Sequence, residues 1–282
     1  MSKKKNKEAV DSKLYSKKYY MTINEGGKIF NKGKGRQLST RLRRHYNLAF
    51  IKKGNKVLDI GCGRGEIVAQ AAIDGAQGIG IDYSSDSIKI CNEIKKTFKP
   101  EIRKRMKFTK ADSKKLQFPA NSIDKVFMLD VVEHLYDWEL KIVYKKIRKF
   151  LKKDGILIVH TTPNTDFYKH GYPIVRIVYP ILRPFSSKIV ELINTKPNWR
   201  NRKFLPKDPE EGQEYNKEGH INEQNPRTLK KMLEDAGFKV EIKLVPFTRH
   251  VDSRGIRVIY RLLSLPFIKK IFSAEITAIC KK

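Results

Sequence analysis

The chain has 282 residues and a formal net charge of +30, with 60 lysines and arginines against 30 aspartates and glutamates. A hydrophobic content of 40% can fill the core of one α/β domain with insertions, which argues against wholesale disorder. The 3 cysteines are too few for a disulfide framework, and no apolar run is long enough for a signal peptide or a spanning helix, so we expect a cytoplasmic protein.

Residues 1–36 are rich in lysine and glycine and include Tyr15, Tyr19 and Tyr20. This composition predicts a basic N-terminal extension, a mobile tail that becomes a first helix over residues 38–50. One folded domain is expected to occupy residues 37–282.

From residue 56 onward, short β-rich runs alternate with amphipathic segments. The predicted strands are 57–61, 78–82, 106–112, 123–129 and 155–162, and the predicted helices are 66–72, 85–98 and 138–151. Strands joined by helical crossovers imply a Rossmann-like, doubly wound α/β fold with a mostly parallel sheet. Its ligand crevice should lie at the carboxyl ends of the strands.

The second half of the chain is less regular. A helix over 226–236, closed by Gly237, precedes strands over 238–245 and 275–280. Two insertions, at about 165–218 and 249–272, interrupt this pattern, and we expect them to form a helical cap over the crevice.

The first predicted strand runs into a glycine loop, Asp59-Ile60-Gly61-Cys62-Gly63-Arg64-Gly65. Its G-x-G-x-G spacing differs from the G-x-G-x-x-G of dehydrogenases. Asp82 ends the next strand, where a carboxylate can accept hydrogen bonds from a ribose diol. Asp112 follows the third strand, with Ser113 beside it, at the level of an adenine amine.

Together, VLDIGCGRGE, GIGIDYS, KADSKKLQFP and FMLDVVEHL resemble the motifs of class I S-adenosylmethionine-dependent methyltransferases. The resemblance implies a seven-stranded sheet and S-adenosylmethionine as cofactor. It assigns the methionine end to Asp59, Gly61 and Gly63, the ribose to Asp82, the adenine to Asp112 and the sulfonium to Asp130, and it brings Cys62, Tyr83 and Ser113 into the same site. Alternatively, Asp59 and Asp130 only cap backbone turns.

The run Asp130-Val131-Val132-Glu133-His134, with the later His220, resembles two methyltransferase groups: ubiquinone-biosynthesis O-methyltransferases and small-RNA 2′-O-methyltransferases. The second group implies that Asp130, Glu133, His134 and His220 hold Mg²⁺ or another divalent ion, although Asp130 stands where that group has a glutamate. The metal-free interpretation is that Glu133 and His134 shape the pocket. In that case His134, His160 or His220 is the general base, and His134, Glu133 and His220 form the candidate catalytic set.

The acceptor is the least determined feature. Residues 172–185 and 255–272 mix apolar and basic residues at helical spacing, which favours a lipid-linked, glycan or other small acceptor at an anionic membrane surface, or simply a cap. An RNA acceptor and a non-catalytic nucleotide-binding protein are the alternatives. The positive charge favours polyanionic partners, although lysine-rich codon usage would produce it without any partner.

Overall fold

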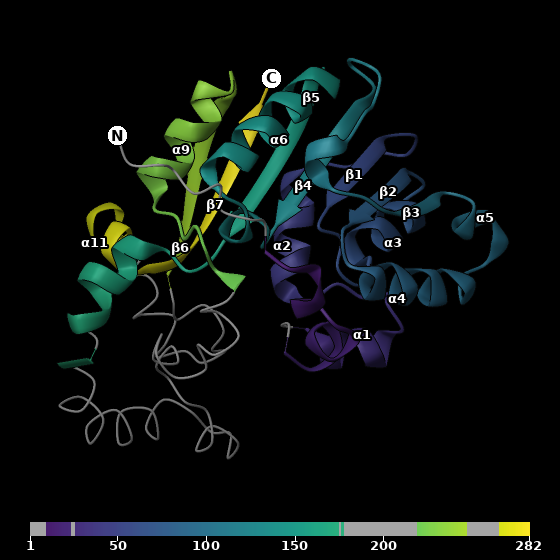
Figure 1. Cartoon of the computed structure of the whole chain (residues 1–282), viewed down its shortest axis with the longest axis horizontal. Coiled ribbons are helices and arrows are strands. Elements are labelled where there is room, and N and C mark those ends of the chain that lie inside the picture. Colours follow the sequence, from purple (N-terminus) through teal and green to yellow (C-terminus); the bar gives the residue numbers. More distant parts are fainter. Residues whose placement is uncertain (1–9, 24–25, 175, 178–218, 247–264) are drawn as a thin grey trace.

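The structure is a computed structural model that describes residues 10–23, 26–174, 176–177, 219–246 and 265–282. Its centre is a seven-stranded sheet in the order β3-β2-β1-β4-β5-β7-β6, which crosses the molecule from right to left in Figure 1. The strands are β1 (Lys56–Ile60), β2 (Gln77–Asp82), β3 (Met106–Lys110), β4 (Ile123–Leu129), β5 (Leu151–Thr161), β6 (Lys239–Pro246) and β7 (Ser273–Lys281).

Strands β1 to β5 pair in parallel, and β7 is antiparallel to both β5 and β6. The predicted Rossmann-like, mostly parallel seven-stranded sheet is therefore confirmed. The described α-helices are α1 (Gly27–Gly33), α2 (Thr40–Leu48), α3 (Glu66–Ile73), α4 (Ser85–Lys96), α5 (Pro100–Arg103), α6 (Asp137–Phe150), α9 (Pro226–Asp235) and α11 (Pro266–Phe272). Short helical turns are η1 (Ser12–Leu14), η2 (Tyr19–Ile23), η3 (Ser113–Lys115), η4 (Val132–His134) and η5 (Phe167–Gly171).

Alternating residues along the central strands fill two separate apolar clusters, because successive side chains of a strand point to opposite faces. Leu58 of β1 joins the cluster that contains Leu140 of α6 and Leu229 of α9. Val57 joins the cluster that contains Tyr46 of α2 and Ile67 of α3. The sheet is thus covered by helices on both faces, which leaves its carboxyl edge as the place for a site.

The N-terminal segment is folded against this domain. Tyr15, Tyr20 and Phe30 are buried, and they pack with Ile90 of α4. The prediction of a mobile tail is therefore wrong for residues 10–23 and 26–36. The segment is held in place because the aromatic side chains among the lysines bury enough apolar surface.

Of the two expected cap insertions, residues 178–218 and 247–264 lie outside the described residues. Their flanks contact each other, since η5 packs against α11. Within the part of the chain that the structure describes, no helix is both long enough and apolar enough to cross a membrane.

Candidate functional site

A cavity of about 350 Å³ opens at the carboxyl ends of β1, β2 and β4. This size suits a nucleoside-sized ligand. It is lined by every residue that the sequence assigned to the cofactor, namely Asp59, Gly61, Cys62, Gly63, Asp82, Tyr83, Asp112, Ser113 and Asp130. The structure therefore brings this predicted set together at one edge of the sheet.

The glycine loop forms the floor of the cavity. The N–H groups of Gly61 and Cys62 both donate to the carbonyl of Ile81, at 2.8 and 2.9 Å, which ties the loop to β2. Gly61 has a φ of 72°, and a Cβ there would collide with the side chain of Val131. Glycine is required at this position because the backbone is left-handed and its neighbour is already in contact.

Asp82 lies at the end of β2 and is buried. Its carboxylate accepts hydrogen bonds from the N–H groups of Gly63 at 3.0 Å and Ser84 at 2.9 Å. The hydroxyl of Tyr20 donates to it at 3.4 Å. Burial raises the pKa of Asp82, and these donors oppose the rise. The backbone donors fix the carboxylate, and the long contact to Tyr20 is the one that a ligand diol could replace.

Asp59 is buried at the carboxyl end of β1. Burial, and then the nearby Asp82 and Glu66, raise the pKa of its carboxyl group to about 8. Among the described residues no hydrogen bond to this carboxyl group is present, so Asp59 is not acting as a turn cap. A buried acid without a donor is suited to a ligand that brings a positive charge.

Asp112 combines a structural and a lining role. Its side chain accepts the N–H of Lys114 at 2.9 Å, which caps η3, and it also lines the cavity beside Ser113. The Lys114 ammonium lies 3.1 Å from Asp112 and 2.7 Å from Glu139. Burial lowers the pKa of Lys114, but the two carboxylates outweigh burial and raise it. This wall of the cavity is therefore an ordered ion-pair network.

Asp130 follows β4 in a left-handed conformation with a φ of 55°. Its two oxygens contact Arg41 Nη1 at 2.5 Å and His160 Nδ1 at 2.6 Å. Burial favours the neutral acid, but Arg41 and His160 outweigh burial and hold the pKa of Asp130 well below its usual range. Burial likewise opposes protonation of His160, but Asp130 raises its pKa to about 9. His160 is thus a cation at neutral pH, which removes it as a candidate base.

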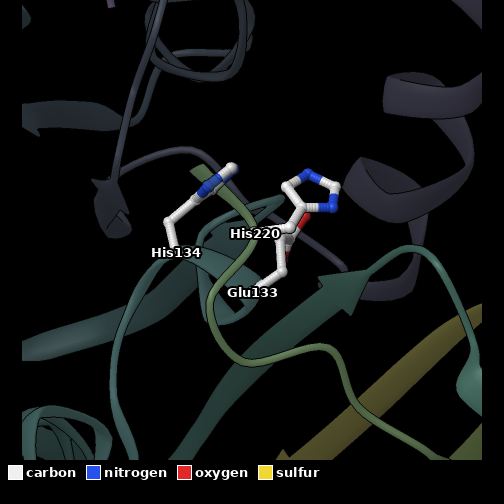
Figure 2. Close-up of side chains that lie close together, drawn as sticks. All are labelled: Glu133, His134 and His220. Carbon is white, nitrogen blue, oxygen red and sulfur yellow. The ribbon is translucent and has the colours of Figure 1, made fainter. Parts of the chain in front are cut away.

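Glu133, His134 and His220 come together as predicted (Figure 2). One ligand atom from each lies within 4.8 Å of the others. The main-chain carbonyl of Glu133 accepts the N–H groups of Ile221 at 3.0 Å and Asn222 at 3.1 Å, which holds the His220 loop against η4. Asp130 does not belong to this group, because both of its oxygens are engaged by Arg41 and His160. Asp130 as a fourth metal ligand therefore stays a prediction that the geometry of the described residues does not support.

The three groups differ in protonation. Burial, and then the nearby charge of Asp130, raise the pKa of Glu133 to about 7, and Thr161 donates to it at 2.8 Å. Burial, and then His220, lower the pKa of His134 to about 4. Burial also acts against the charged form of His220, but Glu223 and Glu133 outweigh it and raise that pKa. His134 is therefore a neutral imidazole at physiological pH.

Of these three residues, only His134 lines the cavity. Its Nδ1 lies 2.9 Å from the carbonyl oxygen of Gly219 and 2.9 Å from the hydroxyl of Tyr15. A carbonyl oxygen can only accept, so Nδ1 carries the ring proton and Nε2 carries a lone pair. Tyr15 also stacks edge-on against His134, with 5.4 Å between the ring centroids.

Several lining residues were not predicted from the sequence as site residues. They are Tyr15, Tyr19 and Tyr20 from the N-terminal segment, Arg41 from α2, and Lys114 and Glu139 from the wall of the cavity. The signal for the tyrosines was present, because three aromatic residues lay among lysines in a segment expected to be mobile. Arg41 and Glu139 are ordinary helix-surface residues in the sequence, and only packing reveals their role.

The comparisons agree with this geometry. A family model described as a methyltransferase domain matches residues 34–242. Sterol 24-C-methyltransferase of Saccharomyces cerevisiae is 32% identical over 157 residues, which are 54% of this chain and 40% of that protein. This chain therefore matches less than half of that relative's length.

Solved structures share the fold. An S-adenosylmethionine-dependent methyltransferase from Archaeoglobus fulgidus superposes with a TM-score of 0.54 at 23% identity, covering 90% of this chain and 99% of that chain. A phosphoethanolamine N-methyltransferase from Haemonchus contortus, in complex with phosphomonomethylethanolamine and S-adenosylhomocysteine, gives 0.56 at 16% identity, with 95% and 60% covered.

Proposed function

Because this chain belongs to the methyltransferase-domain family, we propose that it uses S-adenosylmethionine to methylate a hydroxyl oxygen of a small, lipid-linked or glycan acceptor. The observation that carries the proposal is His134, a neutral imidazole whose Nδ1 faces the Gly219 carbonyl and whose ring lines the cavity. A base of this kind is what a hydroxyl acceptor requires, because the oxygen must lose its proton as the methyl group is transferred.

The cavity fits the cofactor in its chemistry as well as its size. We assign the methionine end to Asp59 and the glycine loop, where Gly61 lines the cavity and a Cβ would collide with Val131. Asp82 would accept the ribose hydroxyls, and Asp112 the exocyclic amine of adenine. When bound, the cofactor supplies a methyl group on a sulfonium. A nucleophile would take this methyl group in line, with the thioether as the leaving group.

The remaining residues position and deprotonate the acceptor. His134 Nε2 would take the hydroxyl proton, while the Gly219 carbonyl holds the imidazole in the required tautomer. Asp130, kept ionised by Arg41 and His160, would place a fixed negative charge beside the sulfonium. Burial raises the pKa of Tyr15, so its phenol stays neutral and serves to orient the base.

The test measures transfer of labelled methyl into separated lipid, glycan, RNA and metabolite fractions of the source cell. His134→Ala should keep cofactor affinity and lose about a hundredfold or more of the transfer rate. His170→Ala is the matched control, because His170 is exposed on η5 and does not line the cavity. Asp82→Ala should instead abolish cofactor binding in calorimetry.

Full transfer by His134→Ala would contradict the oxygen acceptor and favour a carbon acceptor, as in the name of the sterol relatives. Label in the RNA fraction alone would replace the small acceptor with the RNA alternative. An apolar acceptor gains support from those relatives, which are sterol 24-C-methyltransferases.

A second candidate is metal-assisted transfer, favoured by the convergence of Glu133, His134 and His220. A carboxylate and two imidazoles are a donor set that divalent ions accept in proteins. An ion there would polarise the acceptor hydroxyl, and His134 would then be a ligand instead of the base. The two candidates use the same imidazole and are mutually exclusive.

The two candidates differ in their response to chelation. If the ion is required, EDTA abolishes transfer, and both Glu133→Ala and His220→Ala reproduce that loss while cofactor affinity stays unchanged. Full activity after dialysis against EDTA would exclude the ion and leave His134 as the base.

A further inference from the structure

A second hollow lies at the amino-terminal edge of the sheet, on the side where the C-terminus ends in Figure 1. Its volume is about 750 Å³, and it is lined by five lysines and two aspartates. The lysines are Lys52, Lys125, Lys152, Lys153 and Lys282, and the aspartates are Asp124 and Asp154. Strand β4 runs from this edge to the cofactor cavity, so the two sites occupy opposite ends of the same strands.

Lys125 forms part of this hollow with no partner of its own. Only 9% of the residue is exposed, and no hydrogen bond or ion pair to its ammonium is present among the residues that the structure describes. The nearby Asp124 is already engaged by Lys152 at 2.8 Å and by the N–H of Lys56 at 2.8 Å. Burial lowers the pKa of Lys125, Asp124 and Asp154 oppose this, and Lys52 adds to it. The stem of Lys125 is buried, while its ammonium reaches the hollow without a partner among the described residues, where an anion could pair with it.

The backbone brings further lysines to the same place. Ile123 of β4 pairs with Leu151 of β5, but Lys125 pairs with Ile156, so residues 152–155 bulge out of the β4–β5 ladder. The bulge carries Lys152 and Lys153 to the hollow beside Lys125. Bulges that redirect side chains in this way are common next to functional sites.

An exposed aromatic ring stands on the rim. Phe50 lines the hollow and is 72% exposed. Its φ of 49° is left-handed, a conformation that costs a bulky residue about 1 kcal/mol or more and that glycine would adopt freely. Both the exposure and the strain are unfavourable to folding, which is a pattern expected where a residue serves a ligand.

We propose that this hollow binds the phosphodiester backbone of single-stranded nucleic acid, with Phe50 stacking on a base. Lysines supply the phosphate contacts and an aromatic ring the stacking platform, which is the combination used by sequence-tolerant single-strand sites. The formal charge of +30 adds long-range attraction for such a polyanion. A flat bilayer surface is less suitable, because the Lys125 ammonium lines a recess that a phosphate of a flexible strand can enter.

The test uses the full chain and a fluorescein-labelled oligouridylate of twelve nucleotides, followed by anisotropy over a range of salt concentrations. Lys52→Glu/Lys153→Glu should weaken binding at least tenfold and lower the salt slope by about two. Both side chains are exposed and make no hydrogen bond or ion pair with the other described residues, so we expect the fold to be retained. Phe50→Ala should weaken binding about tenfold without changing the salt slope, and Phe50→Tyr should restore it.

The matched control is Lys141→Glu/Lys145→Glu, which makes the same charge change on exposed positions of α6. The affinity of this control variant for the oligouridylate should change less than threefold. Equal losses in both charge-reversal variants would mean diffuse attraction by net charge and would overturn the proposal. The proposal would also be overturned if the protein did not bind the oligonucleotide but bound anionic phosphatidylglycerol vesicles, and if Lys52→Glu/Lys153→Glu lost that vesicle binding. A retained shift of the melting temperature with S-adenosylhomocysteine confirms that each variant is folded.

Discussion

At the scale of single residues, Asp59 is the group whose charge should depend most directly on the cofactor. It is buried at the end of β1 with Asp82 and Glu66 nearby, and these surroundings raise its pKa to about 8. In the ligand-free protein at pH 7 the carboxyl group is therefore mostly protonated. An ammonium brought by the methionine end would favour the carboxylate and lower that pKa.

We therefore expect S-adenosylmethionine binding to release a proton at pH 7. Affinity should rise with pH until about pH 8, by at most about tenfold per pH unit, because the group must lose its proton below that value. Calorimetry at pH 7 in two buffers with different ionisation enthalpies measures the release. Asp59→Asn should bind more weakly and release none, and a wild-type protein that releases no proton would show that Asp59 does not meet the ammonium.

At the scale of elements, the segment over residues 10–23 lines the cavity, and polar contacts to its main chain hold it there. Two of these contacts are short and come from side chains at the glycine loop and after β2. Ser84 Oγ donates to the carbonyl of Tyr15 at 2.7 Å, and Arg64 Nη1 donates to that of Tyr20 at 2.7 Å. Arg64 also pairs with Glu66 at 2.9 Å inside the same wall. The glycine loop, which carries Arg64, thus fixes the segment that closes the site above it.

The segment should therefore open more readily when Arg64 is removed. Arg64→Gln/Glu66→Gln removes both charges of the buried pair, and we expect trypsin to cleave after Lys17 and Lys18 about tenfold faster, since the loss of a charged hydrogen bond makes local opening easier. Glu66→Gln alone keeps the contact to Tyr20 and is the control. Mass spectrometry measures the cleavage rate. An unchanged rate in the double variant would show that apolar packing alone holds the segment.

At the scale of the whole molecule, one mostly parallel sheet has the cofactor cavity at the carboxyl ends of its strands and the lysine-lined hollow at their amino ends. The carboxyl edge has acids that await a cofactor, and the amino edge has lysines that surround an unpaired ammonium. Burial of the Asp59 and Asp82 carboxyl groups at the first site, and of most of Lys125 at the second, reduces the stability of the unliganded fold.

Lys125→Met should accordingly raise the free energy of unfolding at pH 7, by about 1 kcal/mol. Because the folded state lowers the pKa of Lys125, the unfolded state holds the proton more tightly, so the penalty in the wild type fades as the pH rises towards the usual lysine range. The gain should therefore shrink above pH 9 in urea unfolding. The control is Lys141→Met at an exposed position of α6, which should change the free energy of unfolding by less than about 0.5 kcal/mol. A lower free energy of unfolding in Lys125→Met would mean that the ammonium stabilises the fold.

The sequence by itself determined the sheet with its helices and the cofactor half of the site. Strand and helix periods are local, and the predicted helices begin and end within two residues of those observed. Asp59 and Asp82 lie at the carboxyl ends of strands and Asp112 follows one, and the carboxyl ends of parallel strands must meet at one edge. This rule is why spacing along the chain was enough to gather them in one cavity.

Only the tertiary structure decided which side chains surround the cofactor half of the site. Tyr15 meets His134 across 119 residues and Arg41 meets Asp130 across 89, and no period in the sequence encodes such pairs. The same holds for Lys125, which in the sequence is one lysine among many in the chain. Its isolation arises because Asp124 turns to Lys152 and to the main chain of Lys56. Contacts between distant segments depend on how helices and loops pack on the sheet, and that packing is settled by the whole chain at once.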